Sequence, residues 1–259
     1  MTIMFLIAAD IGNSSIHIGI FPQDRFYVLR IDTHPVQTSE AYQRIVSHFI
    51  QETTAVEHTC TGAIISSVVP SLTAAMQKAL GNFSSTEPML VGPQIKTGLS
   101  YHIPEPKKLG SDRIANAVAA YEKYQGPVAV SDFGTATTVS IVGDQAGFLG
   151  GAIMPGIRLM NESLETGTEL LRKVPLAMPA SPLGTDTVHC IQSGLFYGTA
   201  GAVERILDET EQALGIPLNF IITGGFAESI SPFLQRKHDH APSLTIDGLK
   251  IIYERNRDA

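Results

Sequence analysis

The sequence predicts an α/β protein made of two copies of one strand-strand-strand-helix-strand-helix-strand unit, arranged around a central cleft. Two patterns support this prediction. Short apolar runs of strand length alternate with segments of helical spacing in both halves of the chain. A turn of the form Asp, apolar residue, Gly follows the first expected strand of each half. With 259 residues, of which 44% are hydrophobic, the chain is long enough to bury a sizeable core.

The first half begins with a short apolar run, Phe5–Ala9, which Asp10 ends. Tyr42, Ile45, Val46 and Phe49 have the spacing of one helix face. Pro70 stands after a β-branched strand, where a proline suits the first turn of a helix. The expected elements are strands 5–9, 16–21, 26–31, 63–69 and 89–91, helices 40–51 and 70–80, and a loop over 92–110.

The second half repeats much of this order without a linker. A Pro-rich loop at 175–182 precedes a long segment of mostly helical pattern. We expect two domains, 1–114 and 115–259. The expected elements of the second half are helices 114–124, 155–167, 188–214, 227–234 and 249–256, strands 128–132, 137–142, 148–153 and 220–223, and a loop at 238–242.

Composition narrows the class of protein. The net charge of −7 and the pI of about 5.6 disfavour binding to nucleic acid or to an anionic membrane. Cys60 and Cys190 belong to no C-x-x-C pair, which argues against a disulfide framework and a cysteine metal site. The apolar N-terminal run has no basic residue before it and is too short to span a membrane, so we expect a cytoplasmic location.

The two Asp-x-Gly turns point to phosphate chemistry. They read Asp10-Ile-Gly-Asn-Ser-Ser and Asp132-Phe-Gly-Thr-Ala-Thr, and each precedes an apolar β-branched strand. Glycine lets the backbone approach a ligand, successive N–H groups can bind an anion, and the aspartate can hold Mg²⁺. One such turn is more often only a β-turn, but the matching pair favours phosphate binding.

Gly110-Ser111-Asp112-Arg113 lies where a loop meets an expected helix. Asp112 could be a helix cap and Arg113 a solvated charge. The functional interpretation is a carboxylate that faces a substrate hydroxyl and a guanidinium that faces a phosphate or carboxylate. Two further glycine turns, Gly224-Gly225 and the run from Gly150-Gly151 to Pro155-Gly156, are strand–helix turns that would also suit a nucleotide site.

In this order, the Asp10 turn, the 110–113 run, the Asp132 turn and the 150–156 run resemble type III pantothenate kinase, over about residues 4–257. The family belongs to the acetate and sugar kinase, Hsp70 and actin superfamily. The resemblance implies two RNase H-like (actin-like) domains. It also implies ATP-dependent phosphorylation of pantothenate to 4'-phosphopantothenate, the first step of coenzyme A biosynthesis.

The resemblance also implies roles for individual residues. Asp112 matches the proposed general base, with Asp132 as the competing candidate. Asp132 and Asp10 match metal ligands, for a monovalent cation (K⁺ or NH₄⁺) and for Mg²⁺ respectively, and a homodimer is implied. The ATP contacts implied are Asp10, Ile11, Gly12, Asn13, Ser14, Ser15, Ile16, His17 and Thr135, and the pantothenate contacts are Tyr101, Gly110, Ser111, Asp112, Arg113 and Thr187.

Two alternatives stay open at the level of sequence. The first is a catalytically silent relative with a regulatory role, since the family includes proteins first described as accessory factors for toxin-gene expression. The carboxylates of Asp10, Asp112 and Asp132 favour catalysis, because an interaction module does not need all three. The second is another small-molecule phosphotransferase or ATPase of the same fold, because a fold does not fix a substrate.

Overall fold

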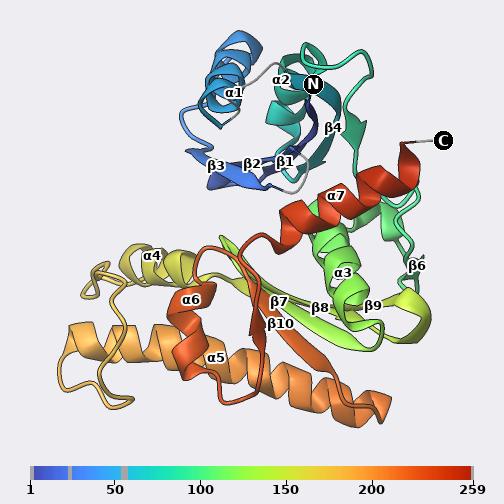
Figure 1. Cartoon of the computed structure of the whole chain (residues 1–259). Coiled ribbons are helices and arrows are strands. Elements are labelled where there is room, and N and C mark those ends of the chain that lie inside the picture. Colours follow the sequence, from blue (N-terminus) through green and yellow to red (C-terminus); the bar gives the residue numbers. More distant parts are fainter. Residues whose placement is uncertain (1–2, 23–24, 54–57, 258–259) are drawn as a thin grey trace. The chain divides into compact units, whose positions relative to one another are not determined.

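The computed structural model describes residues 3–22, 25–53 and 58–257. Contacts divide the chain into two compact units, which are described separately (Figure 1). The first unit comprises Met1–Leu99, Pro104–Ala119 and Leu244–Ala259. The second comprises Ser100–Ile103 and Ala120–Ser243. Residues 244–259 belong to the first unit because the helix they contain packs on that unit's sheet. The expected domains 1–114 and 115–259 stay a prediction.

The first unit has a five-stranded sheet in the order β3-β2-β1-β4-β5. The first three strands are antiparallel, whereas β4 and β5 run parallel to β1. This arrangement confirms the expected strand and helix order of the first half. The elements are β1 Ile3–Ile11, β2 Ser15–Pro22, β3 Tyr27–Asp32, α1 Ser39–Thr53, β4 His58–Ser67, α2 Pro70–Gly81, β5 Met89–Leu90, a 3₁₀ turn Pro106–Lys108, α3 Ser111–Tyr124, which continues into the second unit, and α7 Leu244–Asn256.

The two faces of this sheet are covered differently. Ile7, Ile11 and Ile18 alternate onto the face that packs against the apolar residues of α1 and α2. The other face carries α7. A Cβ atom on Gly19 would collide with Ile246 of α7, and one on Gly62 would collide with Tyr253. Glycine at these two strand positions therefore lets the helix lie close to the sheet.

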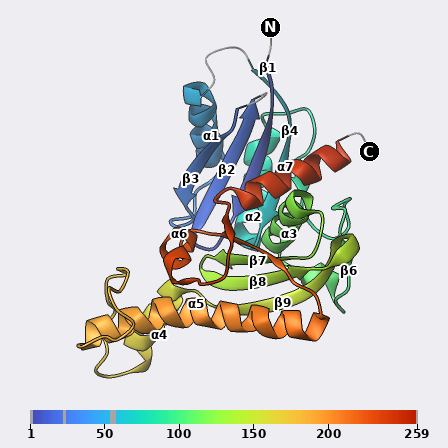
Figure 2. The same cartoon turned by 60° about the horizontal axis from the view of Figure 1, so that its bottom comes forward.

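The second unit has a six-stranded sheet in the order β11-β10-β7-β8-β9-β6. The long helix α5 lies along this sheet, as Figure 2 shows. It contributes Phe196, Val203 and Leu207 to the core. The elements are β6 Ser100–Tyr101, β7 Val128–Phe133, β8 Ala136–Val142, a 3₁₀ turn Asp144–Ala146, β9 Gly147–Pro155, α4 Ile157–Gly167, α5 Thr187–Leu214, β10 Asn219–Thr223, α6 Ala227–Ile230, a 3₁₀ turn Ser231–Phe233 and β11 Asp239–His240.

The structure corrects several expected boundaries. Helix α3 begins at Ser111 and not at residue 114, so Asp112 and Arg113 lie in its first turn. Pro155 ends β9 instead of opening α4. Pro232 divides the expected 227–234 helix into α6 and a 3₁₀ turn. The expected loops 92–110 and 238–242 contain the two-residue strands β6 and β11, and α7 begins at residue 244 instead of 249.

Candidate active site

The Asp10 turn joins β1 to β2 in the first unit. The Gly12 amide donates to the Ser15 carbonyl (3.0 Å), which closes the turn. Thr33, the residue after β3, binds the turn twice: its hydroxyl donates to the Gly12 carbonyl (2.7 Å), and its main-chain amide donates to the Ser14 carbonyl (3.2 Å). Asn13 and Ser14 are exposed, as phosphate contacts must be. Ile11 and Ile16 are buried in the core, so only their main-chain atoms could reach a ligand.

A network of hydroxyl groups connects this turn to the start of α3. Ser66, at the end of β4, donates to Oδ1 of Asp10 (2.9 Å), and its oxygen lies 3.0 Å from Oγ of Ser111. The Ser111 hydroxyl also accepts from the Ser67 amide (2.8 Å). Ser66 and Ser111 are both buried. These bonds fix the first turn of α3, and therefore Asp112, beside the end of β1 that carries Asp10.

Asp112 and Arg113 are half-buried in that first turn. Oδ1 of Asp112 accepts from the Arg113 amide (2.8 Å). Burial raises the pKa of Asp112 above its ordinary value, although this hydrogen bond and the charge of Arg113 oppose the rise. A carboxylate with a raised pKa is a better proton acceptor than an exposed one. The position therefore suits a group that orients or deprotonates a hydroxyl.

The Asp132 turn is the corresponding feature of the second unit. Asp132 is the second-last residue of β7, and the Gly134 amide donates to the Ala136 carbonyl (3.1 Å). The two other glycine turns, at Gly156 and Gly224, contact the Asp132 turn. The Gly156 amide donates to the Thr135 carbonyl (3.0 Å), and a Cβ atom on Gly224 would overlap Oδ1 of Asp132. Gly224 has φ = 95°, a conformation that favours glycine. Three turns separate in the sequence thus surround one carboxylate.

The site offers few groups of the kind that bind metal ions. Among the residues that the structure describes, no group of three or more His, Cys, Asp or Glu side chains is placed to hold a metal ion. Mg²⁺ that arrives with a nucleotide needs only one or two carboxylates, because phosphates and water complete its shell. Asp10 can supply that carboxylate. Around Asp132, carboxylate and main-chain carbonyl oxygens are the donors that suit a hard monovalent cation.

Tyr101 and Thr187 occupy different parts of the second unit. Tyr101 lies on β6, which pairs with β9, and its ring is 6.5 Å from that of Phe148. Thr187 is the exposed first residue of α5. Asp186 before it caps the helix by accepting from the His189 amide (3.0 Å).

The predicted residues therefore fall into two sets, one in each unit. In the first unit, the 10–17 turn and the 110–113 run meet through Ser66 and Ser111. In the second unit, Asp132 and Thr135 meet the turns of Gly156 and Gly224. Sequence reasoning did not assign Ser66 to the site. The sequence feature that could have indicated Ser66 is a pair of serines at the end of an apolar strand. In the sheet, this strand runs parallel to β1, and Ser66 pairs with Asp10 near the end of β1.

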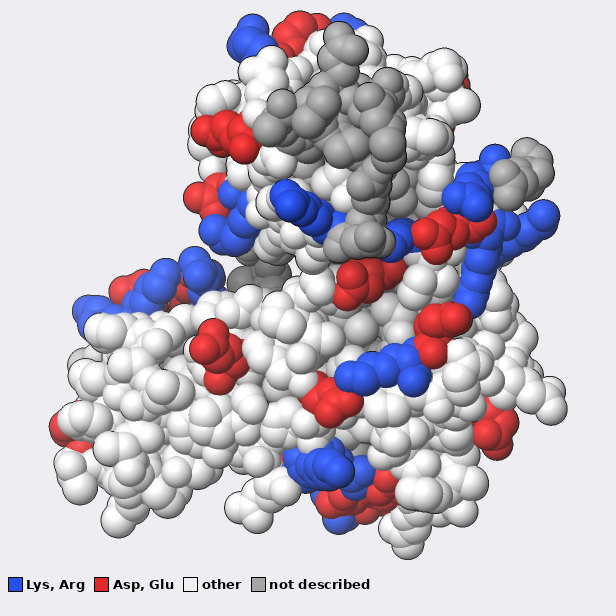
Figure 3. Space-filling view, in the orientation of Figure 1, with Lys and Arg blue, Asp and Glu red and all other residues white. Residues whose placement is uncertain are grey.

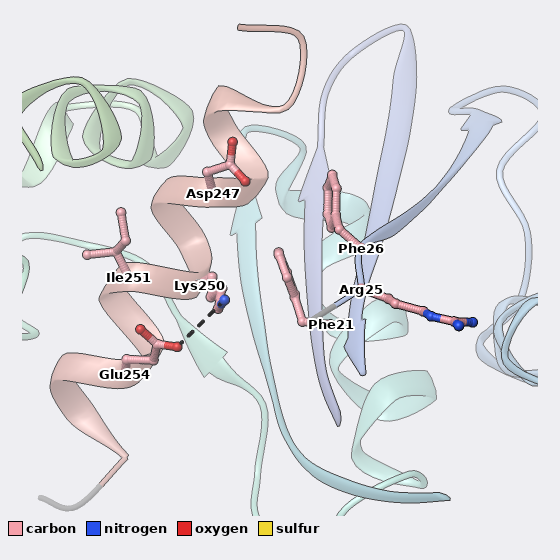
Figure 4. Close-up of a pocket in the computed structure, with 7 residues that line it drawn as sticks. All are labelled: Phe21, Arg25, Phe26, Asp247, Lys250, Ile251 and Glu254. Atoms are coloured by element: carbon pink, nitrogen blue, oxygen red, sulfur yellow. Dashed lines mark ion pairs between the residues drawn. The ribbon is translucent and has the colours of Figure 1, made fainter. Parts of the chain in front are cut away.

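A separate groove of about 480 Å³ lies on the first unit. Figure 4 shows the rings of Phe21 and Phe26, whose centroids are 4.8 Å apart, facing α7. None of the predicted site residues lines it. The lining residues are Phe21, Arg25, Phe26, Asp247, Lys250, Ile251 and Glu254.

Two general features accompany the site. On the face drawn in Figure 3, acidic and basic side chains are interspersed, without one large area of either sign. No helix in the described part of the chain is both long and apolar enough to cross a membrane.

Solved structures identify the fold. Ethanolamine utilization protein EutJ from Carboxydothermus hydrogenoformans matches with a TM-score of 0.55 at 13% identity, over 96% of this chain and 89% of that one. The activator of 2-hydroxyisocaproyl-CoA dehydratase from Clostridium difficile matches with a TM-score of 0.55 at 10% identity, over 99% and 98%. The fold is that of the actin-like ATPases and sugar kinases, which confirms the expected duplicated RNase H-like architecture. These likenesses define the class of fold, a duplicated actin-like α/β fold.

Sequence comparison identifies the family. A family model described as type III pantothenate kinase matches residues 6–209. Type III pantothenate kinase of Brevibacillus brevis is 37% identical over 97% of this chain and 99% of its own length. That of Myxococcus xanthus is 36% identical over 97% and 98%. The chain belongs to the type III pantothenate kinase family.

Proposed function

We propose that this protein uses ATP to phosphorylate the primary hydroxyl of pantothenate, which gives 4'-phosphopantothenate for coenzyme A biosynthesis. Membership of the family along nearly the whole chain supports the reaction. The observation that carries the mechanism is the hydroxyl network that holds Asp112 next to the Asp10 turn. A silent relative would have no use for this arrangement. The cytoplasmic location expected from the sequence stays a prediction.

Asp112 is the residue that acts on the acceptor. It orients the pantothenate hydroxyl and takes its proton as the bond to phosphorus forms. Because the transition state of phosphoryl transfer is loose, the proton can leave late, and positioning matters more than base strength. Arg113, on the same first turn, offsets negative charge on the phosphoryl oxygens or holds the substrate carboxylate. Gly110, Ser111, Tyr101 and Thr187 are proposed as further pantothenate contacts.

The Asp10 turn binds the phosphates of ATP. Its exposed Asn13 and Ser14 donate to phosphate oxygens, and Asp10 is the ligand proposed for Mg²⁺. Bound Mg²⁺ would neutralise the charge that develops on the phosphates. In the second unit, Thr135 contacts ATP, and Asp132 with nearby main-chain carbonyls is proposed to hold K⁺ or NH₄⁺.

A homodimer is part of the proposal, and α5 is its proposed surface. Gly194, Gly198 and Gly201 are exposed within the helix, and among the described residues nothing lies within 4 Å of a Cβ added to any of them. Each costs the helix about 1 kcal/mol relative to alanine. A second copy packed closely on this face would explain them. The exposed apolar residues Tyr197 and Val188 lie on the same helix.

Two experiments test the proposed function. Purified protein is mixed with ATP and pantothenate, and phosphopantothenate is measured directly, with Asp112→Asn as the inactive control. ATP turnover that pantothenate does not change would refute the assignment. Light scattering then compares the mass of the wild type with that of Gly198→Glu, in which a charged side chain occupies the dimer face. The variant should be monomeric, and a wild-type monomer would refute the dimer.

A further inference from the structure

Four side chains form one row across the first unit's sheet at the level of Asp10. Strand register pairs Asp10 of β1 with Ser66 of β4 on one side and with His17 of β2 on the other. His17 in turn pairs with Arg30 of β3. Residues that pair directly across strands lie on the same face of a sheet. The row therefore runs Ser66, Asp10, His17, Arg30 on the face opposite α1 and α2.

The two ends of this row differ chemically. At the Ser66 end, hydrogen bonds lead to Ser111 and so to the turn that carries Asp112, where the acceptor hydroxyl is proposed to bind. At the other end lie an imidazole and a guanidinium. In phosphoryl transfer, the attacking and leaving oxygens are roughly in line on opposite sides of the transferred group. Asp10 lies between the Ser66 end and the Arg30 end of the row. The Arg30 end is therefore on the side of the leaving nucleotide.

The state of the two basic residues suits this side. Burial first, and then the charge of Arg30, lowers the pKa of His17. Arg30 forms an ion pair with Asp32 at 3.2 Å, and both side chains are exposed, Arg30 by 60% and Asp32 by 71%. Exposed ion pairs of this kind contribute little to stability. Arg30 can therefore exchange this partner for a phosphate at little cost.

Distance also permits the contact. Arg30 lies two strands from Asp10, which corresponds to about 10 Å between backbones. An extended arginine side chain and the phosphate tail of a nucleotide bound at Asp10 can together span this distance. The guanidinium has the planar, forked shape that matches phosphate oxygens.

We infer that Arg30 is a further nucleotide-binding residue, which contacts the phosphate tail of ATP and of the ADP that leaves, and that His17 positions its side chain. This inference rests on the proposed function for the direction of transfer. It assigns binding to β3, a strand outside the 10–17 segment. The ligand is the phosphate tail of a nucleoside diphosphate or triphosphate.

The test measures ADP binding by calorimetry, without pantothenate. Arg30→Gln should raise the Kd for ADP roughly tenfold, the loss expected for one charge-assisted hydrogen bond. Arg30→Lys should recover part of the affinity, because it keeps the charge but not the fork. Arg25→Gln is the matched control. Arg25 is an exposed arginine of the same unit, lines the groove in Figure 4 and lies outside the row, so its loss should leave the Kd unchanged.

Kinetics separates a binding role from a structural one. In Arg30→Gln, the KM for ATP should rise about tenfold, as the Kd does, while the KM for pantothenate and the melting temperature stay at wild-type values. An unchanged Kd for ADP in Arg30→Gln, or an equal loss in Arg25→Gln, would overturn the inference. If the wild type does not phosphorylate pantothenate, the proposed function fails, and the ADP titration still decides the role of Arg30.

Discussion

The hydroxyl of Ser66 donates a 2.9 Å hydrogen bond to Oδ1 of Asp10, across the parallel pair of strands β4 and β1. The same hydroxyl lies 3.0 Å from Oγ of Ser111. A single buried oxygen thus connects the Asp10 turn with the helix that carries Asp112. Positions of Asp10 and Asp112 are therefore coupled within one unit.

Ser66→Ala should remove this connection and leave the Ser111 hydroxyl with one partner fewer. The loss of buried hydrogen bonds should lower the free energy of unfolding by about 1–3 kcal/mol. The KM for ATP should rise as well, because Asp10 loses a group that orients it. Urea denaturation and steady-state kinetics check this. Ser85→Ala, at an exposed position in the same unit, is the control and should change neither quantity.

Asp112→Asn should lower kcat by roughly 10²–10⁴-fold, because the amide cannot accept the hydroxyl proton. Stability should not fall. Burial raises the pKa of Asp112 in the folded protein, so the charged carboxylate costs stability at any pH above that pKa, and the neutral amide removes the cost. Kinetics and thermal unfolding at pH 7 check both statements. A kcat near the wild-type value would reduce Asp112 to a structural residue and favour Asp132 as the base.

The pH dependence of kcat/KM follows from the same shift. The reaction needs the ionised carboxylate, so kcat/KM should rise with pH through the pKa of Asp112 and then level off. Because burial moves this pKa above 3.8, the rise should occur at higher pH than an exposed aspartate would give. The residual activity of Asp112→Asn should lack this rise. If the wild type and Asp112→Asn show the same rise of kcat/KM with pH, the rise belongs to another titrating group.

Replacing K⁺ or NH₄⁺ with Na⁺ at equal ionic strength should lower activity, since equal ionic strength removes screening as a cause. Asp132→Asn should weaken this cation response more than the dependence on Mg²⁺. The experiment titrates each cation against wild type and variant. Equal rates in Na⁺ and K⁺ would argue that Asp132 is a second Mg²⁺ contact or the catalytic base.

Gly224→Ala should be destabilising, because its Cβ would overlap the Asp132 carboxylate and its φ of 95° strains any side chain. We expect a loss of about 1–3 kcal/mol in the free energy of unfolding and a weaker cation response. Gly225→Ala is the matched neighbour, since no described atom lies within 4 Å of its added Cβ. Its stability should remain near that of the wild type, and equal effects at both positions would contradict the argument.

Local patterns predicted most of the fold. Strand and helix order in the first half followed from apolar periodicity, and Pro70 marked the start of α2 correctly. Periodicity failed at polar boundaries. The first turn of α3 has few apolar residues, so apolar periodicity does not indicate where the helix begins. Tertiary hydrogen bonds to Ser111 fix the position of this turn instead. The two-residue strands β6 and β11 exist only through pairing with distant strands, which no local pattern records.

The candidate site was predictable in its residue types but not in its connections. The paired Asp-x-Gly turns and the 110–113 run could be read from the chain directly. The convergence of Gly156 and Gly224 on the Asp132 turn depends on contacts between segments far apart in the sequence. Arg30 gave no motif signal, because its place in the row arises from strand register.

Helix α7 has a consequence for how the protein is made. It covers the face of the first unit where Gly19 and Gly62 leave room for it, yet it is synthesised after every strand of that unit's sheet. On the ribosome, β1 and β4 emerge long before the helix that shields them. Residues Ala120–Ser243, by contrast, form most of the second unit as one continuous stretch. The later unit can therefore complete its core while the earlier one still exposes apolar surface, so nascent chains halted before residue 244 should depend on chaperones.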